Sequence, residues 1–246
     1  MNETIWNLLP IVIFAGLLRG YAGFGFAAVA IVGFNFFLPP QQGVPVILAL
    51  DVLCSAGLWQ QAKKQADIPT FKLLALGAIL GIPVGLALLI FIPETTLKLL
   101  ICIAILLFTL ALLFDLRVKS TETLKTKLAF GLASGIGTAG ASVGGPMILS
   151  YMLSSKLSSV VQRATMILFF MVSETLALIA IVASGLISFE IAKLLAILLL
   201  PTMLAVRAGQ WLFNRKPPKS LKHFALPIMG LAALLGISAS IGALLQ

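Results

Sequence analysis

Charged residues are scarce in this sequence: they fill only 10% of its 246 positions, whereas 60% are hydrophobic. A soluble domain of this length needs more charge to cover its surface, so the composition excludes an ordinary globular protein. The apolar residues form long runs along the whole chain, which indicates an integral membrane protein. The net charge of +9 comes from basic residues in short loops between these runs. Such loops are typical topology signals, so we expect no nucleic-acid partner.

Histidine and cysteine are also scarce, with one histidine, His223, and two cysteines, Cys54 and Cys102. Both cysteines lie inside apolar runs, so we expect them to be reduced core thiols. The sequence contains no zinc-binding HExxH motif and no Walker-type phosphate loop. It therefore predicts neither a metal site nor a cofactor, and it argues against an intramembrane enzyme and an ATP-driven pump.

Eight apolar blocks alternate with short polar loops, and most match the roughly 20 residues that a membrane-spanning helix needs. The blocks are residues 5–37, 43–60, 71–92, 97–116, 126–153, 160–185, 189–213 and 221–244. The two halves of the chain, 1–118 and 119–246, share a pattern of glycine and proline. Gly16, Gly20, Gly85 and Pro93 correspond to Gly131, Gly135, Gly209 and Pro217. Internal repeats of this kind are common in secondary transporters.

The basic residues predict how the blocks cross the membrane. Three loops are basic, around Lys63, between Arg117 and Lys127, and around Arg215, and the positive-inside rule assigns all three to the cytoplasm. Two loops on the same side of the membrane must be separated by an even number of crossings, but three apolar blocks separate the last two basic loops. We therefore predict that block 126–153 is a helical hairpin that enters and leaves on the cytoplasmic side. Block 5–37 becomes the equivalent hairpin on the external side.

The predicted fold is all-α: a polytopic membrane protein of two inverted repeats, each a glycine-broken helical hairpin plus three transmembrane helices. The two hairpin blocks contain "GLLRGYAGFGFA" and "GLASGIGTAGASVGGP". Such runs are poor helix interiors, because each glycine costs about 1 kcal/mol relative to alanine. The alternative is eight spans with two kinked helices, which would leave one basic loop on the wrong side of the membrane.

Glycine-rich breaks at membrane depth predict a protein-lined cavity, because hydrocarbon cannot satisfy exposed backbone amides. Half-helix N-termini at such breaks offer free N–H groups and a positive dipole end, which favour an anion. The candidate substrate-binding residues are Arg19, Gly20, Gly23, Gly25, Thr138, Gly140, Ser142, Gly144, Gly145 and Arg163. Two alternatives stay open at this point. Small residues also allow close helix packing, and arginines also snorkel to the membrane interface.

Two acidic residues, Asp51 and Glu174, lie in the middle of apolar blocks at corresponding places in the two halves. A buried carboxyl group avoids its charge by binding a proton, or keeps it by pairing with a cation. Asp51 and Glu174 are therefore candidates for proton coupling, or for structural counter-ions of Arg19 or Arg163.

Two motifs, "GLLRGYAGFGFA" and "GLASGIGTAGASVGGPMIL", followed by "QRATMILFF", resemble the sulfite exporter TauE/SafE family of membrane proteins. The resemblance extends from about Leu9 to Ile241. It implies transport of sulfur-containing anions, such as sulfite, sulfoacetate and related sulfonates, across the bacterial cytoplasmic membrane. The first motif departs from the more glycine-rich form, because Ala27 and Ala28 follow "GFGF".

The sequence thus predicts a multi-pass secondary transporter for a small oxyanion. It would work by alternating access, coupled to protons or driven by the membrane potential. The alternatives are an anion channel and a transporter of a different small anionic metabolite. A structural scaffold is disfavoured, because it would not need glycine breaks and buried charges in both halves. The expected partners are the anionic substrate and membrane lipid, and a homodimer is left open.

Overall fold

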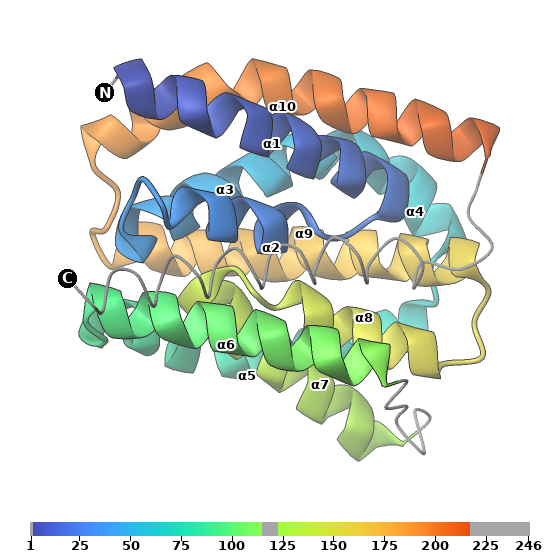
Figure 1. Cartoon of the computed structure of the whole chain (residues 1–246). Helices are drawn as coiled ribbons and strands as arrows, with labels where there is room; N and C mark the ends of the chain where they lie inside the picture. The colour runs from blue at the N-terminus through green and yellow to red at the C-terminus, as the bar shows by residue number, and fades with distance from the viewer. Residues whose placement is uncertain (1, 115–122, 217–246) are drawn as a thin grey trace.

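The computed structural model describes residues 2–114 and 123–216, and this part of the chain is helical with no strands (Figure 1). The helices are α1 (Asn2–Ala22), α2 (Phe26–Phe34), α3 (Pro40–Ser55), the 3-10 turn η1 (Ala56–Leu58), α4 (Trp59–Gln65), α5 (Ile68–Phe91), α6 (Glu94–Leu113), α7 (Leu124–Ala141), α8 (Gly145–Ser154), α9 (Ser159–Ala183) and α10 (Phe189–Arg215). The all-α prediction is confirmed. The predicted span 221–244 lies outside the described residues.

Five stretches within the described part are long and apolar enough to cross a membrane: Glu3–Ala22, Pro40–Gln65, Ile68–Phe91, Ser159–Ala183 and Phe189–Arg215. Their outer surfaces carry large apolar side chains, and Phe91 and Phe189 are 80% and 85% exposed. An apolar outer surface of this kind suits hydrocarbon, in which helices satisfy their own backbone groups. The protein is therefore a polytopic membrane protein.

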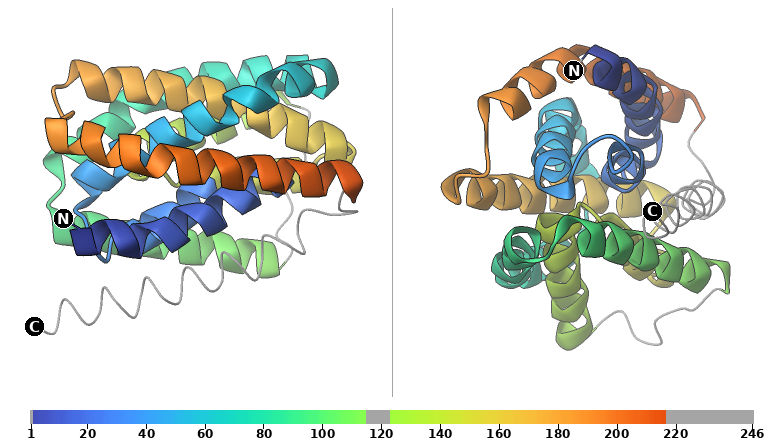
Figure 2. Two further views of the ribbon diagram at one scale, coloured as in Figure 1. Left: turned by 90° about the horizontal axis from the view of Figure 1, so that it is seen from above. Right: turned by 60° about the vertical axis from the view of Figure 1, so that its left-hand side comes forward.

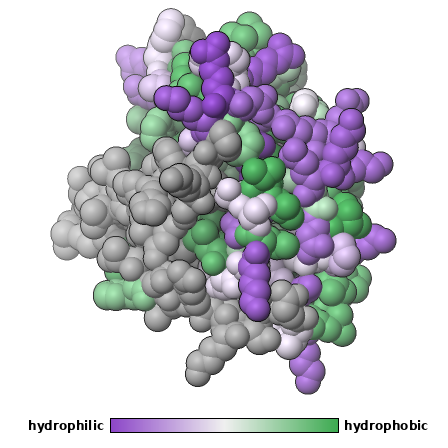
Figure 3. All heavy atoms as spheres, turned by 90° about the vertical axis from the view of Figure 1, so that its right-hand side faces the viewer, coloured by the Kyte–Doolittle hydropathy of each residue, from purple (hydrophilic) through white to green (hydrophobic). Residues whose placement is uncertain are grey.

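The two ends of the helical bundle differ in charge. Lys63, Lys64 and Arg215 lie at the end toward the right of Figure 1, which we call the basic end, and Figure 3 shows hydrophilic side chains gathered there. Glu94 and Glu190 begin α6 and α10 at the opposite end, which we call the acidic end. The positive-inside rule predicts that the basic end faces the cytoplasm.

Both glycine-rich blocks break and turn back on themselves. α1 leads from the acidic end into the bundle, and after the break at Gly23–Gly25 helix α2 returns toward that end (Figure 1). Gly23 and Gly25 have φ of +78° and +95°, values that glycine adopts without strain. α7 leads in from the basic end and α8 returns to it, with a break at Ser142–Gly144. The opposite membrane orientation of the two halves stays a prediction.

Most of the other glycines serve close helix packing, which the sequence left open. A Cβ atom on Gly20 would lie 2.9 Å from the Cα of Gly209, so α1 and α10 are in direct backbone contact. A Cβ atom on Gly81 would lie 2.9 Å from the backbone nitrogen of Ile136, so α5 and α7 are equally close. Gly131 belongs to the same α5–α7 contact, and it stays helical because this packing offsets the poor helix propensity of glycine.

The packing is reciprocal between the halves. The first helix of the N-terminal hairpin, α1, packs on α10 of the second half, and the first helix of the C-terminal hairpin, α7, packs on α5 of the first half. Helices α2, α3 and α9 lie between these two pairs, as Figures 1 and 2 show. A twofold relation between the halves would produce this arrangement. The arrangement places the two helix breaks toward the middle of the bundle.

Candidate functional site

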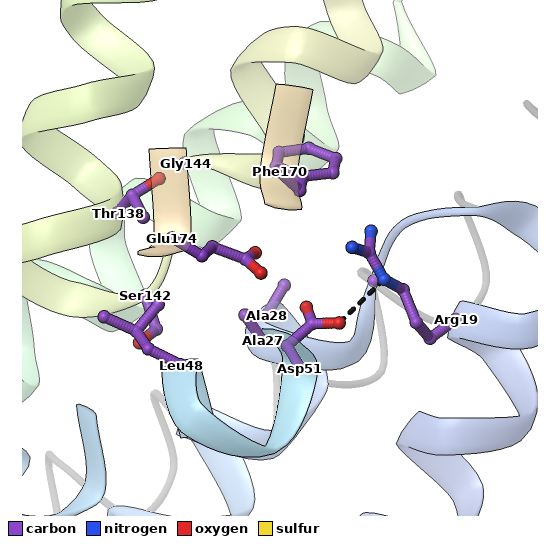
Figure 4. A pocket seen from close by; sticks show the side chains of 12 residues that line it. Arg19, Ala27, Ala28, Leu48, Asp51, Thr138, Ser142, Gly144, Phe170 and Glu174 are labelled. Carbon is purple, nitrogen blue, oxygen red and sulfur yellow. Dashed lines mark ion pairs between the residues drawn. The ribbon is translucent and has the colours of Figure 1, made fainter. Parts of the chain in front are cut away.

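A small cavity lies between the two helix breaks (Figure 4). Its volume is about 10 Å³, which is the space of roughly one water molecule, so the cavity is small in this conformation. Residues from both hairpins and from α3 and α9 line it: Arg19, Gly25, Ala27, Ala28, Leu48, Asp51, Thr138, Ser142, Gly144, Gly145, Phe170 and Glu174. Eight of these were candidates from the sequence, and they come from blocks that are far apart in the chain.

Arg19 is held in place on one side and unpaired on the other. It is only 1% exposed, so it does not snorkel to the membrane surface. Its Nε donates to Asp51 Oδ1 at 2.7 Å and lies 2.9 Å from Ser55 Oγ, and its Nη1 donates to the carbonyl of Gly23 at 2.6 Å. Its guanidinium also lies 5.2 Å from the ring centre of Phe170. Nη2 is buried with no hydrogen-bond partner in the described structure, so Arg19 retains one free donor group at the cavity.

The two buried acidic residues have different surroundings. Asp51 on α3 pairs with Arg19 and also accepts a hydrogen bond of 3.0 Å from Ser55 Oγ. Glu174 on α9 points across the cavity toward Asp51 (Figure 4). It is 3% exposed, and its Oε2 has no hydrogen-bond partner in the described part of the chain. Asp51 therefore acts as a counter-ion for Arg19, whereas Glu174 is a buried carboxyl group with free hydrogen-bonding capacity.

Two helix N-termini border the cavity. Gly25 precedes α2 and Gly144 precedes α8, and neither helix start is capped by a side chain. In α2 the first helical hydrogen bond comes from Val29 to the carbonyl of Gly25, which leaves the N–H groups before it without helical partners. Pro146 occupies the first turn of α8, where no N–H donor is needed. The free N–H groups and the positive dipole ends both favour an anionic ligand.

Hydroxyl groups of the second break complete the polar lining. Ser142 adopts φ of 56°, the single positive value among the described non-glycine residues, and its buried Oγ has no hydrogen-bond partner there. Thr138 lines the cavity one helical turn earlier. Ser134 Oγ donates to the carbonyl of Gly144 at 2.9 Å and so fixes the backbone of the break. The residues therefore present three unpartnered polar atoms to one cavity, from Arg19, Ser142 and Glu174.

Four candidates from the sequence do not line the cavity. Gly20 packs on α10, and a Cβ atom on Gly140 would lie 3.0 Å from the carbonyl oxygen of Gly85 on α5. Gly23 lies beside Arg163, whose Cγ would be 2.6 Å from a Cβ atom on Gly23. Arg163 is buried, and its Nε donates to the carbonyl of Tyr21 at 3.0 Å. Arg163 therefore supports the first break from outside the cavity, whereas Gly20 and Gly140 serve helix packing.

Leu48 and Phe170 form part of the apolar wall, and the sequence reasoning missed them. The sequence nevertheless contains a signal for both residues, which is their helical spacing from an acidic residue. Phe170 lies four residues before Glu174, and Leu48 lies three residues before Asp51, so each shares a helix face with a buried acid. Among the described residues no cluster of three or more side chains suits a metal ion.

Comparison with known proteins identifies the chain by its sequence family. The family model described as sulfite exporter TauE/SafE matches residues 8–236, which is nearly the whole chain. Comparison with curated proteins and with solved structures gave no match. The match covers both helix breaks and every residue that lines the cavity. The chain therefore belongs to the sulfite exporter TauE/SafE family, whose members are membrane transporters of sulfur-containing anions.

Proposed function

We propose that the cavity between the two breaks is the substrate site of a secondary transporter for a small sulfur oxyanion. Sulfite, sulfoacetate or a related organosulfonate would be carried across the bacterial cytoplasmic membrane. The observation that carries the proposal is the meeting of Arg19 Nη2, Ser142 Oγ and two uncapped helix N-termini at one buried cavity. An oxyanion has several acceptor oxygens, so one substrate satisfies donors from both hairpins at once.

The size of the cavity supports a carrier rather than an open channel. About 10 Å³ does not accommodate a sulfur atom with three oxygens, so the site must widen before substrate enters. A channel needs a continuous pathway, whereas a carrier exposes its site to one side at a time. We therefore assign this conformation to a stage of an alternating-access cycle in which the site is too small to hold the substrate.

The charges in the cavity support coupling to protons. One guanidinium and two carboxylates would leave an excess of negative charge, which repels an anion. A proton on Glu174 removes that excess, and Glu174 is the carboxyl group without a cationic partner in the described ion pairs. Anion binding and protonation of Glu174 then favour each other, so substrate and proton cross the membrane together.

The test is sulfite flux in proteoliposomes of purified protein, with and without an imposed pH gradient. We expect saturable flux that the gradient accelerates and that excess unlabelled sulfite inhibits. The steric variant is Gly145→Ala, whose new Cβ atom lies 3.8 Å from Phe170 Cζ and so fits at the cavity wall without backbone clash. It should raise the KM for the anion while the protein stays folded.

Matched empty vesicles and the Gly57→Ala variant, whose new methyl group meets no atom within 4 Å, serve as controls. Non-saturable flux that scales linearly with concentration would indicate an anion channel. Absence of sulfite and sulfonate flux, with flux of another anionic metabolite, would indicate a different substrate class.

A further inference from the structure

A polar network lies between the cavity and the basic end of the bundle. At its centre is Arg163 on α9, which is buried. Arg163 Nη2 donates to the carbonyl of Gly20 at 2.5 Å and to Gln210 Oε1, and its guanidinium stacks 3.9 Å from the ring centre of Phe213. Together with the bond from its Nε to Tyr21, these contacts fasten α9 to the last turn of α1 and to α10.

The network continues from α10 to α4. Gln210 Nε2 donates to Gln61 Oε1 at 2.6 Å and to Asn214 Oδ1 at 3.2 Å. Four helices, α1, α4, α9 and α10, are therefore joined by side-chain hydrogen bonds at one level of the bundle. None of these side chains lines the cavity, so the proposed substrate site does not account for them.

A weaker contact lies on the other side of the cavity. Gln41 on α3 donates through Nε2 to the carbonyls of Leu89 and Ile92, both at 3.4 Å, at the acidic end of α5. Gln41 is half-buried and uncharged. Long bonds from a neutral amide are weaker than short bonds from a buried guanidinium.

Gln41 and Arg163 occupy corresponding positions. Each lies in the first two turns of the helix that follows a hairpin, α3 or α9. Each also precedes a cavity residue by seven positions, because Leu48 follows Gln41 and Phe170 follows Arg163 at that spacing. Seven helical residues span about 10 Å, or two turns on one helix face. The two contacts therefore flank the cavity at similar distances on opposite sides.

We propose that these contacts are the two gates of the transport cycle. The network of Arg163, Gln210 and Gln61 holds the basic end closed, and Gln41 with the carbonyls of Leu89 and Ile92 holds the acidic end. The gates differ in strength, so the acidic end opens more readily from this conformation. The inference rests on the proposed alternating-access function, since gates have meaning only around a central site.

The test measures access to the cavity without using substrate. Ser142→Cys places a thiol at the cavity with little change in volume, in a background with Cys54→Ala and Cys102→Ala. A membrane-impermeant maleimide is added to membrane vesicles of each orientation, and the labelling rate is measured from each side. Gln210→Leu should raise the rate from the basic end by about five-fold for each hydrogen bond lost. Gln61→Leu tests the same gate through a second residue.

Gln60→Leu is the matched control, because Gln60 is the exposed neighbour of Gln61. It should leave both rates unchanged. Gln41→Leu should raise the rate from the acidic end and leave the other rate unchanged or lower. Unaltered labelling in Gln210→Leu and Gln61→Leu would overturn the proposal. An equal rise from both sides would also overturn it, because it would show general loosening of the bundle.

The experiment separates the gates from the substrate. If the labelling rates change on the expected sides but the protein transports no sulfur oxyanion, the gates are supported and the proposed substrate is rejected. If the protein transports sulfite but the labelling rates are unchanged in the Gln210, Gln61 and Gln41 variants, the proposed function is supported and the gates are rejected.

Discussion

The guanidinium of Arg19 and the carboxylate of Asp51 form an ion pair of 2.7 Å in the interior of the helical bundle, where both side chains are almost fully buried. The pair joins the end of α1 to the C-terminal half of α3 and so fixes the first break against the helix that follows α2. Asp51 contacts Nε, and Nη1 contacts the carbonyl of Gly23, so Nη2 is left free. The same arginine thereby serves structure through two nitrogens and leaves the third available for the proposed ligand.

Asp51→Asn should destabilise the protein, because it leaves the buried charge of Arg19 without its counter-ion. Loss of one partner from a buried pair costs about 3–5 kcal/mol. Thermal unfolding in detergent should show a clear fall in Tm. The double variant Arg19→Gln, Asp51→Asn should lose less than the sum of the two single variants. Additive losses would mean that the two residues do not act as a pair.

Arg19→Lys should weaken substrate binding more than it weakens the fold. Lysine keeps the positive charge near Asp51 but has no planar fork, so it cannot hold Asp51 and Gly23 while offering a third nitrogen. A hydrogen bond to a charged group contributes about 1.5–3 kcal/mol, which corresponds to roughly a ten- to hundred-fold rise in the KM for sulfite. Flux kinetics and Tm are measured on the same preparation. An unchanged KM would exclude Nη2 as a substrate contact.

Glu174→Gln should abolish the response of flux to a pH gradient, because an amide of the same shape cannot carry a proton. The ratio of flux with and without the gradient should fall to about one. The control is Glu94→Gln, since Glu94 is 50% exposed and pairs with Lys98 at 2.7 Å on the surface, where such a pair contributes little. A gradient response that persists in Glu174→Gln would remove Glu174 from the coupling pathway. A response to sodium instead would identify a different coupling ion.

Gly81→Ala should destabilise the bundle, because the added methyl group would meet the backbone of α7 at Ile136. Overpacking of this kind costs about 1–3 kcal/mol, and backbone atoms cannot move aside as flexible side chains do. Gly57→Ala provides the contrast, because its methyl group enters open space. Equal stability of the two variants in detergent would show that the α5–α7 contact is looser than described.

The sequence predicted both helix breaks but not which glycines form them. Gly23, Gly25 and Gly144 lie in or beside the breaks, whereas Gly131 and Gly140 lie inside α7. The difference depends on α5, whose backbone lies against that face of α7 and is distant in sequence. Local propensity predicts a weak helix there, and tertiary packing overrides it.

The roles of Arg19 and Arg163 also needed the structure. The sequence left each open between a site residue and a snorkelling residue, because only the position of neighbouring helices decides between them. Arg19 meets Asp51, and Arg163 meets backbone carbonyls of α1. Every residue has a backbone carbonyl, so a contact of this kind cannot be predicted from the sequence. Phe170 is different, because its spacing from Glu174 on one helix face was available from the sequence.

The reciprocal packing of α1 on α10 and of α7 on α5 has a consequence for biosynthesis. α1 emerges first from the ribosome, yet the helix that covers its glycine face is made last among the described helices. α5 and α7 are separated by one helix and can pair early. We therefore expect the glycine face of α1 to stay in contact with lipid or with the insertion machinery after synthesis. It can pack on α10 only when nearly the whole polypeptide has been inserted into the bilayer.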